Sequence, residues 1–97
     1  MDGSSHSPTI SIIVVSFNTR EMTLACLGSI VKQGAAHTYE VLVVDNASTD
    51  GSAAAIQAAY GDDARFQLNL GSDNLGFAAA NNLAVKDARG TFMLLLN

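Results

Sequence analysis

The sequence has one cysteine, one proline and no tryptophan, and only 14% of its 97 residues are charged. The single cysteine, Cys26, excludes an internal disulfide and a cysteine-based zinc site. The five lysines and arginines are scattered and the net charge is −4, so the clustered positive surface of a nucleic-acid-binding protein is missing. No apolar run approaches the roughly 20 residues that cross a membrane as a helix. We therefore expect no nucleic-acid partner.

The first eight residues lack the basic and apolar regions of a signal peptide, which makes the cytoplasm the default compartment. We expect residues 1–8 to be a flexible lead-in. The remaining residues, 9–97, belong to a chain that is 48% hydrophobic, which favours a single packed domain over disorder.

Apolar runs alternate with helical patterns along residues 9–97. The patterns predict strands at residues 9–17, 40–44, 65–70 and 92–96, and helices at residues 19–33, 52–60 and 76–88. Short polar side chains and glycines mark the helix ends: we expect Asn18 to cap the first helix, Ser48 or Thr49 to cap the second, and Gly34 and Gly90 to end the first and third.

This β-α-β-α-β-α-β order predicts an α/β fold. Its short connections favour a three-layer α/β/α sandwich with a mainly parallel, Rossmann-like sheet and right-handed crossovers. The third strand alternates apolar and polar residues, so we expect it near an edge of the sheet.

Polar side chains follow three of the predicted strands. The apolar run 12–15 of the first strand leads into Ser16, Phe17 and Asn18, the run from Asp45 to Asp50 follows the second strand, and Asn97 follows the fourth. In an open parallel sheet, ligands bind beyond the carboxyl ends of the strands. The sequence therefore predicts a binding site at this edge.

Several common nucleotide sites do not fit. A dinucleotide site needs glycines after the first strand, and residues 16–20 contain none. Gly71 and Gly76 have the spacing of a phosphate-binding loop, but Phe77 stands where that loop needs lysine. A calcium loop starting at Asn46 would close on Gln57, which cannot supply a bidentate carboxylate.

Four segments, in this order and spacing, carry a resemblance: SIIVVSFN at 11–18, EVLVVDNASTDGS at 40–52, NLGFAAANN at 74–82 and ARGTFMLLLN at 88–97. Together they resemble the N-terminal, nucleotide-binding half of the family 2 glycosyltransferases, which have the GT-A fold. The resemblance implies transfer of a sugar from a UDP- or dTDP-sugar to a saccharide or lipid-linked acceptor, with inversion, as in polysaccharide biosynthesis. The ending LLLN resembles a subgroup that uses dTDP-rhamnose.

The resemblance also implies roles for individual residues. Three positions line the base and ribose pocket: Ser16, Phe17 and Asn18. Asp45 accepts a hydrogen bond from the pyrimidine ring N–H, with Asn46 supporting its loop. Asn74 and Gly76 lie beside the nucleotide and donor sugar, the helix amides after Gly76 can face the pyrophosphate, and Asn81 either fixes the Asn74 loop or reaches the sugar.

Asn97 corresponds to the first position of the family's metal-binding Asp-x-Asp motif. The resemblance implies Mg²⁺ or Mn²⁺ in a longer parent protein, but an amide is a poorer ligand than a carboxylate. We expect residues 9–97 to be an incomplete GT-A domain that contains no catalytic residue, binds the metal poorly and binds nucleotide at most.

An alternative from a different class is a non-catalytic nucleotide-binding or assembly module. The apolar fourth strand would then support self-association through an exposed sheet edge. A position at the inner face of the membrane is an alternative to a purely cytoplasmic one. We expect Phe77 to pack in the core.

Overall fold

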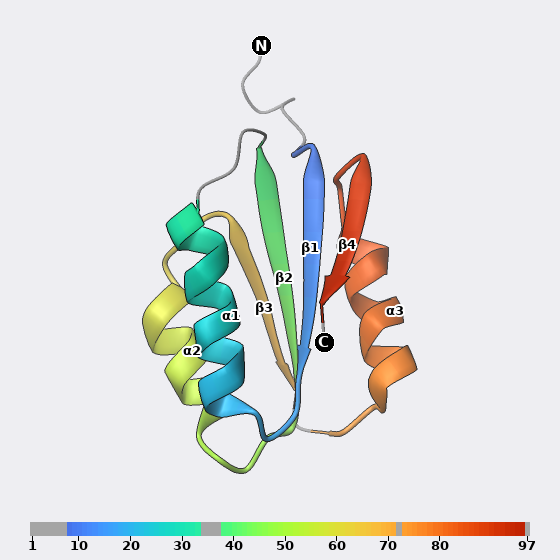
Figure 1. The fold of residues 1–97 in the computed structure, drawn as a ribbon. Helices are drawn as coiled ribbons and strands as arrows, with labels where there is room; N and C mark the ends of the chain where they lie inside the picture. The colour runs from blue at the N-terminus through green and yellow to red at the C-terminus, as the bar shows by residue number, and fades with distance from the viewer. Residues whose placement is uncertain (1–7, 34–37, 72, 97) are drawn as a thin grey trace.

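The structure is a computed structural model that describes residues 8–33, 38–71 and 73–96. Its elements follow the predicted order. They are β1 (Ile10–Ser16), α1 (Arg20–Gln33), β2 (Tyr39–Asn46), α2 (Ser52–Tyr60), β3 (Phe66–Gly71), α3 (Phe77–Asp87) and β4 (Phe92–Leu96) (Figure 1).

The four strands form one parallel sheet in the order β3-β2-β1-β4. In the register of β1 and β2, Ser16 lies opposite Asp45, and Asp45 lies opposite Leu70 of β3. The carboxyl ends of these three strands therefore meet at one edge, at the bottom of Figure 1, where α1 and α3 also begin. The α/β class, the parallel sheet and the edge position of the third strand are confirmed.

Alternate residues of the central strands supply two cores, because neighbouring side chains of a strand point to opposite faces. The core beneath α1 and α2 contains Ile12, Val14, Leu27, Val41, Val43, Ile56 and Phe66. The core beneath α3 contains Ile13, Leu42, Val44, Ala80 and Ala84. Helices thus cover both faces of the sheet, although α3 covers its face alone.

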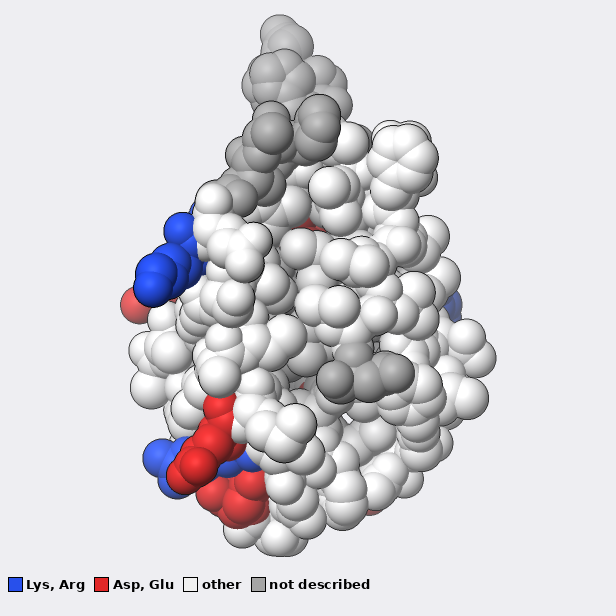
Figure 2. Space-filling model, in the orientation of Figure 1, with Lys and Arg blue, Asp and Glu red and all other residues white. Residues whose placement is uncertain are grey.

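The edge strand β4 is apolar and exposed. Phe92 is 64% exposed, and the next three residues, Met93, Leu94 and Leu95, are about half exposed. Figure 2 shows few charged side chains on the face where β4 lies. Within the described part of the chain, no helix has both the length and the hydropathy needed to cross a membrane.

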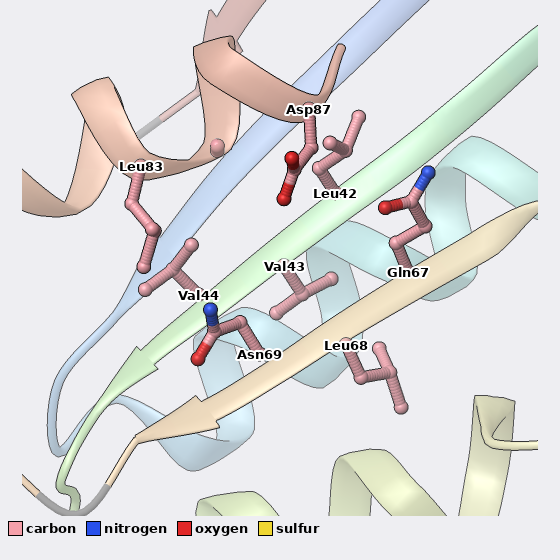
Figure 3. A pocket seen from close by; sticks show the side chains of 9 residues that line it. Leu42, Val43, Val44, Gln67, Leu68, Asn69, Leu83 and Asp87 are labelled. Atoms are coloured by element: carbon pink, nitrogen blue, oxygen red, sulfur yellow. The ribbon is translucent and has the colours of Figure 1, made fainter.

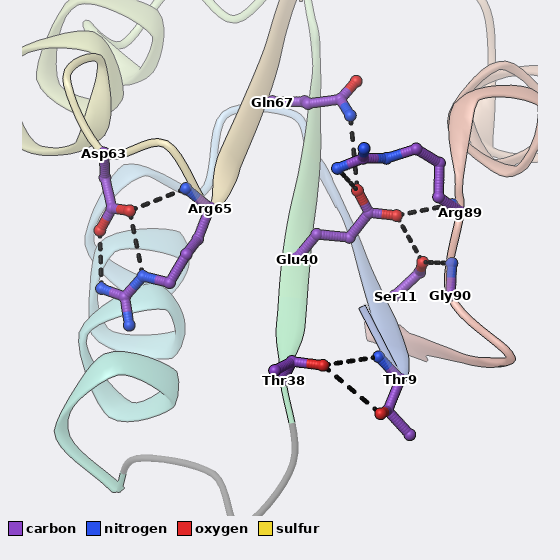
Figure 4. A network of polar contacts seen from close by, with 9 residues as sticks. All are labelled: Thr9, Ser11, Thr38, Glu40, Asp63, Arg65, Gln67, Arg89 and Gly90. Carbon is purple, nitrogen blue, oxygen red and sulfur yellow. Dashed lines mark hydrogen bonds and ion pairs between the residues drawn. The ribbon is translucent and has the colours of Figure 1, made fainter. Parts of the chain in front are cut away.

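A buried carboxylate joins three strands at the amino edge of the sheet. Glu40 of β2 is 3% exposed, and its Oε2 accepts hydrogen bonds from Ser11 Oγ at 2.6 Å and from the Arg89 backbone N–H at 2.7 Å (Figure 4). The Gly90 N–H in turn donates to Ser11 Oγ at 2.8 Å. Longer contacts of 3.4 Å reach Glu40 from Arg89 and from Gln67 of β3.

Gly90 has a different role from the predicted one. Helix α3 already ends at Asp87, and a Cβ on Gly90 would lie 2.6 Å from Ser11 N and Oγ. The absence of a side chain therefore permits close packing of the α3–β4 connection on β1. Gly34 lies outside the described residues.

Two predicted helix caps are wrong. The Asn18 side chain bonds to Thr49 and not to the first turn of α1. Neither Ser48 nor Thr49 caps α2: its N-cap is Gly51, which supplies no side-chain bond, and Asp50 Oδ1 accepts from the Ser52 N–H at 3.0 Å. Asn18, Ser48 and Thr49 bond to one another across the two turns, whereas the prediction had each of them bond to the helix that follows it.

Replacing Glu40 tests the amino-edge network. We expect Glu40→Ala to lower the free energy of unfolding by about 2 kcal/mol, because Ser11 Oγ and the Arg89 N–H would lose their acceptor in a buried setting. Urea denaturation measures this loss. Asp62→Ala is the control, since Asp62 is an exposed carboxylate outside the network; equal losses in the two variants would contradict the role of Glu40.

Candidate functional site

Strand β2 ends in two polar residues that point to opposite faces of the sheet. Asp45 is 1% exposed and continues the Val41 and Val43 side, beneath α1 and α2. Asn46 is 3% exposed and continues the Leu42 and Val44 side, beneath α3. The alternation of a strand thus gives each face of the binding edge one buried polar side chain.

Asp45 holds the β2–α2 turn, residues 47–51. Its Oδ2 accepts from the Ser48 N–H at 3.0 Å and its Oδ1 accepts from Ser48 Oγ at 2.6 Å. Between them, Ala47 has a φ of +60°, a left-handed conformation that L-residues other than glycine, asparagine and aspartate rarely adopt. Because both carboxylate oxygens bond to Ser48, the local geometry makes Asp45 an anchor of this turn.

Asn18 joins the β1–α1 turn, residues 17–19, to the β2–α2 turn. Its backbone N–H donates to Ser48 Oγ at 2.8 Å, and its Oδ1 accepts from the Thr49 N–H at 2.8 Å. Asn18 also has a left-handed φ, of +52°. The bonds from Asn18 to Ser48 and from Ser48 to Asp45 form a continuous path between the two turns.

Asp50 adds a second link between the same turns. Its Oδ2 accepts from the Arg20 N–H at 3.0 Å, while its Oδ1 accepts from the Ser52 N–H and hydroxyl. The Ser52 hydroxyl, followed by the backbone N–H groups of Arg20 and Ser52, lowers the pKa of Asp50 from its ordinary value of 3.8. Asp50 thus accepts the first backbone N–H of both α1 and α2 and joins the two turns.

Asn46 holds the loop that precedes α3. Its Oδ1 accepts from the Leu75 N–H and its Nδ2 donates to the Gly76 carbonyl, both at 3.3 Å. Asn74 Oδ1 accepts from the Gly76 N–H at 2.8 Å, which closes the turn locally. Gly76 has a φ of +83°, and a Cβ there would have no heavy atom within 4 Å, so the backbone at the start of α3 is open to its surroundings.

A hollow of about 370 Å³ lies between the β1–α1 turn and the start of α3, beside the end of β2. Its lining comprises Val15, Phe17, Thr19, Asn46, Asn74, Gly76 and Phe77. Four of the predicted site residues are therefore brought together: Phe17, Asn46, Asn74 and Gly76. The two phenylalanines are 46% and 53% exposed. Phe77 was expected in the core, and that expectation is wrong; its place directly after Gly76, at a helix start, was the signal for exposure.

The other predicted site residues do not line this hollow. Ser16 is fully buried and its Oγ accepts from Thr23 Oγ1 at 3.1 Å, so its side chain serves the fold. Asn18 borders a separate shallow hollow with Asp50. Asn81 is 6% exposed and donates to the Phe77 carbonyl at 3.1 Å, while its Oδ1 has no partner among the described residues. Asn97 lies outside the described residues.

A smaller hollow of about 120 Å³ lies beside α3 over strands β2 and β3 (Figure 3). Leu42, Val44 and Leu83 give it an apolar floor, with Gln67, Asn69 and Asp87 around it. None of the predicted site residues lines it. The hollow at the carboxyl edge is therefore the better candidate for a ligand site.

Comparison with known proteins decides the family. A model of glycosyl transferase family 2 matches residues 11–97. The chain belongs to this family. It is 31% identical over 90 residues to TuaG of Bacillus subtilis (strain 168), whose name describes a teichuronic acid biosynthesis glycosyltransferase. The match covers 93% of this chain and 35% of TuaG.

Two other family relatives broaden the comparison. An N-acetylglucosaminyltransferase of Bradyrhizobium diazoefficiens is 35% identical over 89 residues, which cover 90% of this chain and 18% of that protein. The structure is similar to mannosyltransferase PcManGT from Pyrobaculum calidifontis in complex with GDP-Man and Mn²⁺, with a TM-score of 0.70 and 29% identity over 87% of this chain and 25% of that one. The family 2 chain thus spans about a third or less of these proteins.

The described residues contain no group of three or more histidine, cysteine, aspartate or glutamate side chains that could hold a metal ion. At the carboxyl edge, Asp45 and Asp50 already bond to Ser48 and Ser52. The described residues at this edge therefore form no such group by themselves.

The lowered pKa of Asp50 predicts a pH dependence of stability. The ionised form is stabilised in the folded state, so its contribution is complete above the ordinary pKa of 3.8 and disappears as the pH falls through the lower folded pKa. We expect the melting temperature of the wild type to exceed that of Asp50→Asn at neutral pH, with the gap closing below pH 3.8.

Thermal melting from neutral pH to acid measures this gap. Asp63, whose pKa the Arg65 guanidinium lowers, is present in both proteins and cancels in the difference. Asp62→Asn controls for the loss of one exposed charge. A gap between the wild type and Asp50→Asn that stays constant with pH would contradict the role of the Asp50 charge.

Proposed function

We propose that this chain is the nucleotide-binding part of a family 2 glycosyltransferase that uses a UDP- or dTDP-sugar. In the reaction, an acceptor hydroxyl gives its proton to a general base and its oxygen bonds to the anomeric carbon as the bond to the nucleoside diphosphate breaks. The diphosphate leaves with the bonding electrons, and attack from the opposite side inverts the anomeric centre. The acceptor is a saccharide or a lipid-linked saccharide.

The observation that carries the proposal is the hollow at the carboxyl edge of the sheet. It combines two exposed aromatic rings, Phe17 and Phe77, with two amide side chains, Asn46 and Asn74. Aromatic rings stack on nucleobases, and such stacking contributes about 1–3 kcal/mol per base. The amides supply donors and acceptors for a ribose or a base edge.

The start of α3 gives the diphosphate a place to bind without a cluster of cations. Gly76 leaves the backbone open, and among the described residues no side chain caps the N–H groups of the first turn of α3. N–H groups at the start of a helix bind anions. This helix start borders the hollow in which we propose that the base and ribose bind.

Asp45 supports a preference for bases with a ring N–H. A carboxylate has about four acceptor positions, of which Ser48 uses two. Uracil and thymine offer a ring N–H donor, whereas cytosine offers an acceptor at that position. We propose that one of the two remaining positions accepts the ring N–H of the bound base.

The similar proteins suggest finer features. PcManGT was solved with GDP-Man and Mn²⁺, which supports a divalent cation, Mg²⁺ or Mn²⁺, in the complete enzyme. The name of TuaG supports polysaccharide biosynthesis. We place the reaction in the cytoplasm, at the inner face of the membrane where the acceptor is lipid-linked, and include dTDP-rhamnose among the donors to test.

A second candidate function, an assembly module, is favoured by the exposed apolar strand β4. An exposed, apolar edge strand can pair with another copy of itself. Sedimentation of the chain over a range of concentrations, with Leu94→Lys as the comparison, distinguishes the two proposals: self-association through β4 requires a dimer that Leu94→Lys abolishes.

Removing the Asp45 carboxylate tests nucleotide binding. We expect Asp45→Ala to weaken binding of UDP or dTDP by about 1.5–3 kcal/mol, the range for a hydrogen bond to a charged group. We also expect the wild type to prefer UDP to CDP and the variant to lose this preference. Isothermal titration calorimetry measures both, with GDP as a further ligand.

Two variants separate the explanations. Ser48→Ala removes the hydroxyl that bonds to Asp45 and keeps the carboxylate, so it should retain the preference for UDP over CDP. Asp62→Ala is the control for a lost exposed carboxylate and should bind like the wild type. A wild type that prefers GDP to UDP and dTDP would contradict the proposed donor, and one that binds no nucleotide would contradict the proposed function.

A further inference from the structure

We infer that Asn18 is a positioning residue of the nucleotide site, which locks the β1–α1 turn to the β2–α2 turn without touching the nucleotide. This inference deepens the proposed function and rests on it. It replaces the expectation from the sequence that the Asn18 side chain lines the base and ribose pocket. The hollow that contains Phe17 and Asn74 does not include Asn18.

The backbone at Asn18 restricts which residues can occupy this position. A φ of +52° lies in the left-handed region, where glycine is at ease and asparagine and aspartate are tolerated far better than other residues. Glycine would satisfy the backbone and supply no side chain. Only asparagine or aspartate satisfies the backbone and also offers a side-chain oxygen.

That oxygen is already occupied. Asn18 Oδ1 accepts from the Thr49 N–H at 2.8 Å and, at 3.4 Å, from the Thr49 hydroxyl. In the same place the Asn18 N–H donates to Ser48 Oγ, which itself donates to Asp45. Asn18 thus bonds to two consecutive residues of the neighbouring turn, once through its backbone and once through its side chain.

The bonds between Asn18 and the β2–α2 turn affect nucleotide binding through Phe17. Phe17 directly precedes Asn18 and is one of the two exposed rings of the hollow. If the β1–α1 turn were free to move, the Phe17 ring would have to be ordered each time a ligand bound, at a cost in conformational free energy. Holding the turn in advance removes that cost, so the lock should raise nucleotide affinity without a direct contact.

The rival role is a direct contact through the Asn18 side-chain NH₂ group, which is a donor. Two substitutions distinguish the roles. Asn18→Asp keeps the acceptor for Thr49 and tolerates the backbone, but has no NH₂ group. Asn18→Gly keeps the backbone conformation and loses the acceptor. Asn82→Asp on α3, where the side chain is exposed, is the control for one added negative charge.

The experiment measures UDP affinity of the four proteins by calorimetry in about 0.3 M salt, where long-range charge effects are screened. We expect Asn18→Gly to bind UDP about three- to tenfold more weakly, the effect of one neutral hydrogen bond. We expect Asn18→Asp and Asn82→Asp to bind within about twofold of the wild type. Amide hydrogen exchange at Thr49 should be faster in Asn18→Gly and unchanged in Asn18→Asp.

Each result has one meaning. An Asn18→Asp variant that loses as much affinity as Asn18→Gly overturns the inference in favour of a direct contact by the NH₂ group. If Asn18→Gly exchanges faster at Thr49 but binds UDP with wild-type affinity, the bond to Thr49 does not raise nucleotide affinity. The inference is then overturned, while the proposed function stands. A wild type that binds neither UDP nor dTDP overturns the proposed function, and the inference falls with it.

Discussion

The binding edge depends on two neighbouring side chains at the end of β2 that point to opposite faces of the sheet. Asp45 bonds to Ser48 on one face, and Asn46 bonds to the loop before α3 on the other. Both residues are almost completely buried. A buried carboxylate or amide is stable only with its hydrogen bonds formed, so each fixes the turn that supplies its partners. Asn46 thereby fixes one wall of the hollow directly, and Asp45 reaches the other wall, the β1–α1 turn, through Ser48 and Asn18.

The two edges of the sheet use buried polar groups for different purposes. At the amino edge, Glu40 bonds to Ser11 and to Arg89 and joins strands that are far apart in the sequence. At the carboxyl edge, the backbone at Gly76 is open and the rings of Phe17 and Phe77 are exposed. The amino-edge bonds contribute stability away from the carboxyl edge, which retains left-handed residues such as Ala47 that are costly in a fold.

Much of this fold follows from local pattern. Unbroken apolar runs such as residues 12–15 and 41–44 predict buried parallel strands, and the helices between them follow from period and glycine placement. Side-chain partners do not follow. Asn18 was expected to cap its own helix, yet its oxygen bonds to Thr49, 31 residues away, because the parallel register places the two turns together. Phe77 was expected in the core because it is apolar, yet it is 53% exposed because it is the first residue of α3, beside the hollow.

The scarcity of cations constrains how this edge can bind a diphosphate. With five lysines and arginines in 97 residues, and with Arg65 and Arg89 bonded to Asp63 and Glu40, the described residues leave few charged side chains for phosphate. Backbone N–H groups at the start of α3 carry no net charge, so they bind an anion well only when they are held in place. Asn46 and Asn74 hold that start through Leu75 and Gly76. In the proposed function, these rigid turns therefore contribute to phosphate binding through backbone N–H groups, in a part of the protein with little positive charge.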